Sequence, residues 1–268
     1  GINTVHMLPN LSNIGRNQLW RAPPHGSPFP VSFGYRQVVD VSSGAVYEYG
    51  RGDNLVRIKF PDGMTKYYEG DAGHERVVRA EFSDGMSVNY EGNGGQERMV
   101  RAESLDGTVT EYEGDMGQER MVRADFLEGT IVDYDGDRGQ ERMVRMEVLD
   151  GTIEYYEGSR GQERMVNAEF PNGGLHSYRG ERGQEHKASV TYANGMVEIY
   201  DGDRGQERLV RKEYPNGVWE YYDGERENER LVGRTRPDGT MTNYKGKRGQ
   251  EHAVRRLRPD GTVEELER

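Results

Sequence analysis

Carboxylates, guanidinium groups and phenols recur along this chain at one fixed spacing, and these are side chains that acid–base chemistry and ion binding use. A glutamate stands at every 22nd position from Glu75 to Glu251, and arginine follows it except at His186 and His252. Tyrosine keeps the same period. A catalytic constellation is usually unique within a chain, whereas this one is repeated in every copy. We therefore predict that the chain is not an enzyme and has no catalytic or cofactor-binding residues.

Two of the loops carry enough oxygen ligands to be considered as calcium sites. One loop holds Asp135, Asp137 and Glu141, and the loop over 201–207 repeats the pattern. Calcium takes six or more oxygen ligands, and other copies have Met116 or Ala72 in the loop instead. No histidine pair shows zinc spacing, and cysteine is absent. We predict no metal site.

Glycines define the elements that must position these side chains. Glycine recurs every 22 residues from Gly63 to Gly261, each preceded by Asp, Asn or Glu. In one copy, residues 120–126 and 130–134 have β-forming composition and flank an acidic residue followed by glycine, a strong hairpin signal. The sequence thus predicts an all-β fold of tandem 22-residue β-hairpins, forming an elongated antiparallel sheet or solenoid.

A two-residue turn would fix which side chains share a face. It places Phe126 opposite Ile131 on an apolar face, and Arg123 opposite Tyr134 on the other face. Arginines stacked on tyrosines would gain about 0.5–1 kcal/mol each at exposed sites. The predicted structural ladder consists of Arg79, Arg101, Arg123 and Arg145 beside Tyr90, Tyr112, Tyr134 and Tyr156.

The N-terminal segment differs from the rest of the chain. Residues 1–34 hold five of the ten prolines and no acidic residue, and they do not repeat. We predict an extended, Pro-rich docking segment over 1–34 and a hairpin array over 35–268, with ten copies from about residue 53 and degenerate first and last copies. The alternative is a cap over the first strand edge or a loose terminus. The predicted partner-docking residues are Leu11, Ile14, Arg16, Trp20, Arg21, Phe29 and Phe33.

Charge and hydropathy exclude several classes of partner. The net charge of −11 disfavours nucleic acid. No apolar run approaches the roughly 20 residues that span a bilayer, although peripheral membrane association remains open. The compartment is not fixed, and a soluble or peripheral protein of the cell interior or an organelle is favoured over a secreted one. Near the C-terminus, Arg234, Arg236, Arg256 and Arg258 replace apolar or small residues, which suits a capping repeat.

The repeat resembles the MORN type. The resemblance lies in Tyr-Glu-Gly, as in Tyr112–Gly114, and in Asp-Gly-Thr, as in Asp106–Thr108, and it covers residues 62–268. Residues 106–112 also resemble YD (Rhs-type) repeats, and the Glu-Arg-x-Val-Arg core is similar to repeats of algal and protist proteins. MORN arrays are generally scaffolds that join membranes or proteins, and YD arrays form shells or stalks. Neither resemblance implies catalysis.

These observations favour a non-enzymatic scaffold or structural subunit. It would dock onto or stabilise a larger protein assembly, which can be membrane-associated, through its N-terminal segment and repeat surface. The first alternative is a carbohydrate- or surface-binding module with tyrosines as stacking platforms. The second is a shell or stalk part of a larger YD-like protein.

Overall fold

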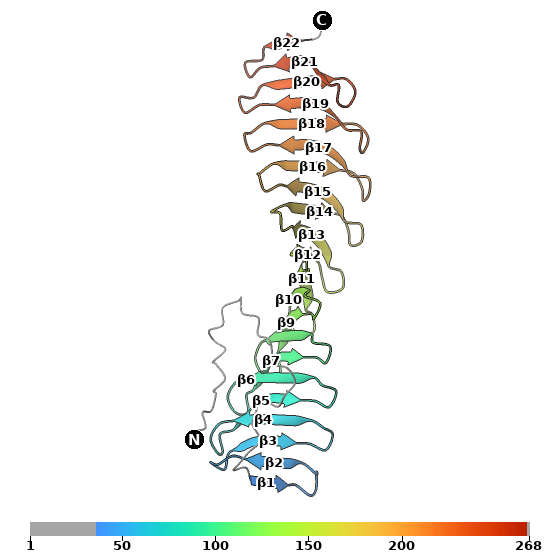
Figure 1. The fold of residues 1–268 in the computed structure, drawn as a ribbon. Coiled ribbons are helices and arrows are strands. Elements are labelled where there is room, and N and C mark those ends of the chain that lie inside the picture. Colours follow the sequence, from blue (N-terminus) through green and yellow to red (C-terminus); the bar gives the residue numbers. More distant parts are fainter. Residues whose placement is uncertain (1–35, 267–268) are drawn as a thin grey trace, which may run out of the picture.

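A computed structural model describes residues 36–266 of the protein. These residues form one open, single-layer antiparallel sheet (Figure 1). This range has 22 strands and no helix, so the all-β prediction is confirmed. The hairpin array was predicted over 35–268 with ten copies from about residue 53, and the strands Arg36–Val39 and Val46–Tyr49 lie before those copies. The predicted docking residues, Trp20 among them, lie outside the described residues.

The strands are β1 Arg36–Val39, β2 Val46–Tyr49, β3 Leu55–Lys59, β4 Thr65–Glu69, β5 Arg76–Glu81, β6 Ser87–Glu91, β7 Arg98–Glu103, β8 Val109–Glu113, β9 Arg120–Asp125, β10 Ile131–Asp135, β11 Arg142–Glu147, β12 Ile153–Glu157, β13 Arg164–Glu169, β14 Leu175–Arg179, β15 His186–Thr191, β16 Val197–Asp201, β17 Arg208–Glu213, β18 Trp219–Asp223, β19 Arg230–Thr235, β20 Met241–Lys245, β21 His252–Leu257 and β22 Val263–Glu265.

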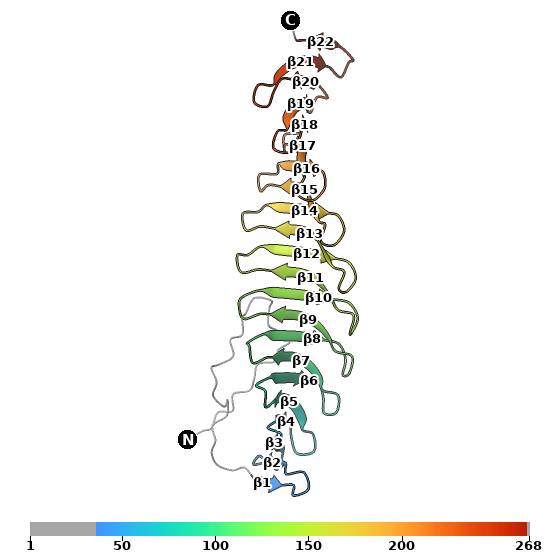
Figure 2. The same ribbon diagram turned by 90° about the vertical axis from the view of Figure 1, so that its right-hand side faces the viewer.

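Each strand pairs with its neighbours along the chain, from β1–β2 to β21–β22. Short turns join the strands along one long edge of the sheet, and longer loops join them along the other (Figure 1). The sheet twists about its long axis: the strands are seen edge-on near β11 in Figure 1, and face-on there after a quarter turn in Figure 2. Twist of this kind follows from the preferred backbone angles of L-residues.

The short turns have three residues, not the predicted two. In the repeat at 117–138, the Phe126 amide donates to the Thr130 carbonyl, and the Gly129 amide donates to the Phe126 carbonyl. This is a type I turn closed by a glycine in the left-handed region, here with φ of 94°. The same bonds recur in the other copies, for example at Phe82 and Gly85.

The longer turn corrects the predicted register and the predicted faces. Ile131 pairs with Asp125, and Asp133 pairs with Arg123. Because residues directly opposite each other share a face, Ile131 joins the charged residues. Val132 pairs with Ala124 and lies with Ala124 and Phe126 on the other face. The expectation that Arg123 opposes Tyr134 is wrong, since one residue of slip exchanges the faces.

The core consists of small side chains. Buried hydrophobic residues include Ala80, Ala124, Val88 and Val132, and no large side chain of the described residues is fully buried. A single-layer sheet encloses nothing, so each hairpin is stabilised by its two neighbours. Such an array has near-additive, nearest-neighbour energetics.

Candidate functional site

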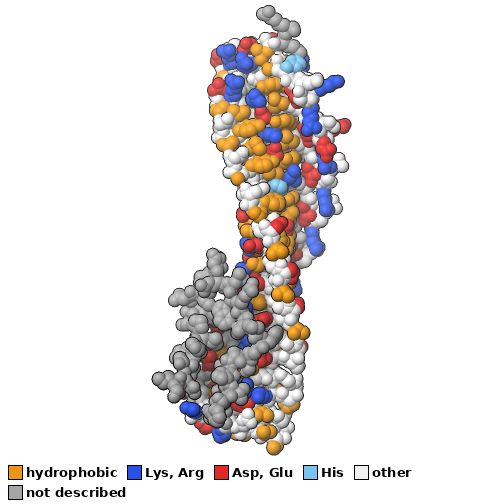
Figure 3. Space-filling model, in the orientation of Figure 1, with side chains coloured by type: hydrophobic (Ala, Val, Ile, Leu, Met, Phe, Trp, Pro, Cys, Tyr) orange, Lys and Arg blue, Asp and Glu red, His pale blue; other side chains and the backbone are white. Residues whose placement is uncertain are grey.

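One face of the sheet is lined with aromatic and aliphatic side chains, and we call it the apolar face. It is defined by Ala124, Phe126, Val132 and Tyr134 and by the residues 22 positions apart from each. The tyrosine column runs unbroken from Tyr68 to Tyr244, and its members are half-buried. The column of Phe126 contains Phe60, Phe82, Val148, Phe170, Tyr192 and Tyr214. Figure 3 shows hydrophobic side chains gathered along this face in the C-terminal half.

Two carboxylates on the apolar face each accept hydrogen bonds from two tyrosine hydroxyls. Glu198 accepts hydrogen bonds from the hydroxyls of Tyr192 at 2.7 Å and Tyr200 at 2.6 Å. Its other oxygen lies 2.8 Å from Nζ of Lys212. Glu198 is buried, and burial raises the pKa of a carboxyl. Here the hydrogen bonds from Lys212, Tyr200 and Tyr192 outweigh burial, so that the pKa of Glu198 is lowered.

The arrangement recurs one repeat later. Glu220 accepts from the hydroxyls of Tyr214 at 2.9 Å and Tyr222 at 2.7 Å, and from Nε of Arg234 at 3.0 Å. Burial opposes ionisation of Glu220 too, but these hydrogen bonds prevail and lower its pKa. The spacing Tyr-x5-Glu-x-Tyr appears at 192–200 and 214–222. The spacing could have been found in the sequence, but the predicted register placed the first tyrosine and the glutamate on different faces of the sheet.

Two lysines lie over tyrosine rings on the same face. Nζ of Lys187 lies 3.9 Å from the ring centroid of Tyr200, and Nζ of Lys212 lies 5.8 Å from that of Tyr222. Both distances suit a cation–π interaction. Over β15–β18 the apolar face therefore carries charges that are already paired inside the sheet, while the aromatic rings remain half-exposed.

Gly174 opens a hollow in the apolar face. Other copies have Met, Thr or Val at this position. The resulting hollow of about 490 Å³ is lined by Phe170, His176, Val190 and Tyr192 among others. The rings of Phe170 and His176 lie 4.5 Å apart. Burial lowers the pKa of His176, with a smaller contribution from the charge of Lys187, so the imidazole is neutral near pH 7. The hollow suits an apolar side chain.

The opposite face carries the arginines of the predicted ladder, with acidic and amide groups beside them, and with Tyr67 opposite Arg79 and Tyr155 opposite Arg145. Nε of Arg123 lies 2.6 Å from Oδ1 of Asp125, and Arg145 contacts both Asp133 at 3.0 Å and Glu147 at 2.7 Å. Similarly, Arg79 pairs with Glu81, and Arg101 stands opposite Glu111 and Asn89. The predicted tyrosine partners, Tyr90, Tyr112, Tyr134 and Tyr156, stand opposite Met99, Met121, Met143 and Met165. The predicted pairing of the ladder arginines with these four tyrosines is therefore wrong.

The repeated glutamate joins successive hairpins, a role that sequence reasoning missed. Oε1 of Glu97 accepts the amide of Val77, 20 residues earlier, at 3.0 Å, and Oε2 accepts the amide of Gly95 at 2.8 Å. Val77 stands where the register shifts by one residue, and a bulge leaves an amide unpaired in the strand ladder. The glutamate satisfies that amide, which explains why it recurs without exception.

Among residues 36–266 there is no group of three His, Asp or Glu side chains arranged to hold a metal ion. Over the same residues, the structure has no helix long and apolar enough to cross a membrane. The features that remain are two large surfaces, one apolar and aromatic, the other a lattice of ion pairs.

No protein-family model and no curated protein matches this chain. Among solved structures, it is similar to the TCP10 domain of Danio rerio CPAP in complex with a STIL peptide, at 14% identity over 86% of this chain and 92% of that one, with a TM-score of 0.27. It is also similar to TcdB2-TccC3-TEV, at 13% identity over 81% of this chain and 15% of that one, with a TM-score of 0.23. Likenesses this distant carry no functional argument, and the MORN resemblance stays a prediction.

Proposed function

We propose that this protein is a non-catalytic scaffold and that its apolar face receives a partner protein. The observation that supports this most is the length of an aromatic face that no second layer covers within residues 36–266. Sheets usually bury such a face against another layer, and extended exposed apolar surface marks interaction sites. Aromatic rings supply contact area at low entropic cost, which makes them common anchors in protein interfaces.

The test is photo-crosslinking from matched positions on the two faces. A benzophenone amino acid replaces Phe126 or Phe170 on the apolar face, or Ile131 on the opposite face, in the full chain expressed in its native cells. We expect the two apolar-face positions to crosslink to the same protein and the Ile131 position to give none of it. Equal labelling from both faces, or retention on a glycan array with no protein adduct, would contradict the proposal.

We further propose that residues 1–34 act as a second docking element. The segment combines aromatic and aliphatic side chains with basic charge and no acid. A chain that lacks residues 1–34 should lose partner capture while its circular dichroism spectrum keeps the β-signal of the repeats. Undiminished capture by the truncated chain would rule out this role and leave the apolar face as the docking surface.

A further inference from the structure

Two columns of the apolar face become cationic in the last repeats. The column that contains Tyr192 and Tyr214 continues as Arg236 and Arg258. The neighbouring column of small residues continues as Arg234 and Arg256. Figure 3 shows Lys and Arg side chains gathered at this C-terminal end of the face. Charge alone would be enough for a repeat that only keeps the end of the sheet soluble. A binding site requires in addition that the arginines face a common space.

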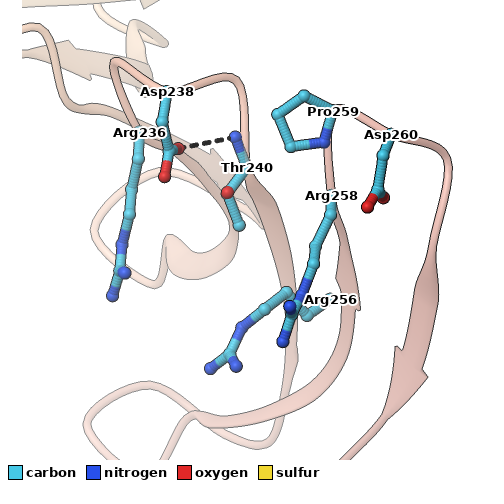
Figure 4. Close-up of a pocket in the computed structure, with 7 residues that line it drawn as sticks. All are labelled: Arg236, Asp238, Thr240, Arg256, Arg258, Pro259 and Asp260. Atoms are coloured by element: carbon cyan, nitrogen blue, oxygen red, sulfur yellow. Dashed lines mark hydrogen bonds between the residues drawn. The ribbon is translucent and has the colours of Figure 1, made fainter.

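Three of the arginines share one hollow. Arg236, Arg256 and Arg258 line a depression of about 510 Å³, and their guanidinium groups extend into the same space (Figure 4). Arg236 is exposed, and none of the residues 36–266 forms an ion pair with it within 4.0 Å. The charge of Asp238 acts on Arg236, but with no ion pair within 4.0 Å the guanidinium keeps its hydrogen-bond donors for an incoming anion.

Acidic groups also lie near these arginines, and the charges of Asp238 and Asp260 interact with Arg236 and Arg258 respectively. Asp238 and Asp260 also line the hollow, and each accepts the backbone amide of a turn threonine at 2.8 Å. Aspartates of the other turns make the same bond, for example Asp106. Glu264 contacts Arg256 at 3.1 Å and Arg258 at 3.5 Å. It is partly exposed on the short edge strand β22, from where an acidic ligand could displace it.

We propose that this hollow, the arginine hollow, binds a carboxylate-rich segment of a partner protein. This inference rests on the proposed function, because it assigns the partner's chemistry at one end of the apolar face. Guanidinium groups bind carboxylates through paired, charge-assisted hydrogen bonds. Tyr192 and Arg236 are four strands apart, about 19 Å at the usual strand spacing. About six extended residues cover that distance, so one segment can contact the aromatic column and the arginine hollow together.

The experiment uses the full chain and a defined probe, fluorescein-labelled hexaglutamate, with hexaglutamine as the neutral comparison. Fluorescence anisotropy at low salt should show binding of hexaglutamate alone. Arg236→Gln should weaken it about tenfold, the effect of losing one charge-assisted hydrogen bond. The matched control is Arg255→Gln, which removes the same charge from the opposite face and should change affinity less than about twofold.

Two outcomes overturn the arginine hollow: no binding of hexaglutamate to the full chain, or an equal loss in both variants, which would mean unspecific charge attraction. The assay needs no native partner, so it separates the two proposals. Hexaglutamate binding without photo-crosslinking from the apolar face would contradict the proposed function alone. Crosslinking without hexaglutamate binding would contradict only the arginine hollow.

Discussion

Two glycines of the same long loop differ in what they tolerate. Gly136 has φ of 116°, and a Cβ there would lie 2.7 Å from the carbonyl oxygen of Gln140. Gly139 has φ of 77° and nothing within 4 Å of such a Cβ. In another copy, Glu227 occupies the position of Gly139 with φ of 67°. The chain therefore already accepts a side chain at one site of this loop.

We predict that Gly136→Ala destabilises the sheet by about 1–3 kcal/mol, because the backbone is strained and the Cβ meets a carbonyl oxygen. The matched variant Gly139→Asn should cost less than about 1 kcal/mol, since asparagine accepts the left-handed region. Urea-unfolding midpoints of the two variants measure the difference. Similar midpoints would mean that the loop rearranges freely.

The buried carboxylates make stability depend on pH. The folded state lowers the pKa of Glu198 and of Glu220. Their contribution is therefore present above the ordinary glutamate pKa of about 4.3 and is lost as the pH falls through the lower folded value. The double variant Glu198→Gln/Glu220→Gln should be less stable than wild type at pH 7 and should lose less stability between pH 7 and pH 3. Parallel losses in wild type and variant, measured by urea unfolding, would contradict this.

At the scale of the hairpin, the repeated glutamate should matter more than a surface ion pair. Glu97→Gln keeps one acceptor oxygen, but its NH2 group would face the backbone N–H of Gly95 or Val77, and two donors cannot form a hydrogen bond with each other. We expect a loss of about 1–2 kcal/mol. The control Glu91→Gln removes an exposed pair with Arg98, 3.4 Å long, and should cost less than about 1 kcal/mol. Thermal unfolding followed by circular dichroism compares them, and equal costs would exclude the inter-hairpin role.

The hairpins themselves could be predicted from the sequence, but their faces could not. Glycine after Asp, Asn or Glu correctly marked the short turns from Gly63 to Gly261. The turn with Glu128 and Gly129 nevertheless contains a third residue, Leu127, which composition does not reveal. Because side chains alternate between the two faces of a strand, this extra residue places each side chain of the following strand on the face opposite to the predicted one. The hydrogen bonds of Glu198 and Glu220 to tyrosines, and the true members of the apolar face, follow only from the observed register, in which Val132 and Tyr134 share a face with Ala124.

At the scale of the whole molecule, the array should tolerate the loss of a complete unit. Deletion of residues 127–148 removes two strands and keeps the alternation of faces and directions on both sides. We expect a folded sheet that is shorter by about 10 Å, two strand spacings, as measured by small-angle X-ray scattering. The matched deletion of residues 127–137 removes half a repeat and should disrupt the pairing. Collapse of both deletion variants would mean that stability is not local.

The sequence by itself determined the repeat length, the hairpin as the unit and the all-β class, because glycine spacing and β-forming composition are local properties of the chain. It also located the substitutions that place Arg236 and Arg258 in an aromatic column. Only the tertiary structure decided that the sheet stays open, and which side chains share a face. Those outcomes depend on turn geometry and on bulges, where one residue of register moves tyrosine from the charged face to the apolar one.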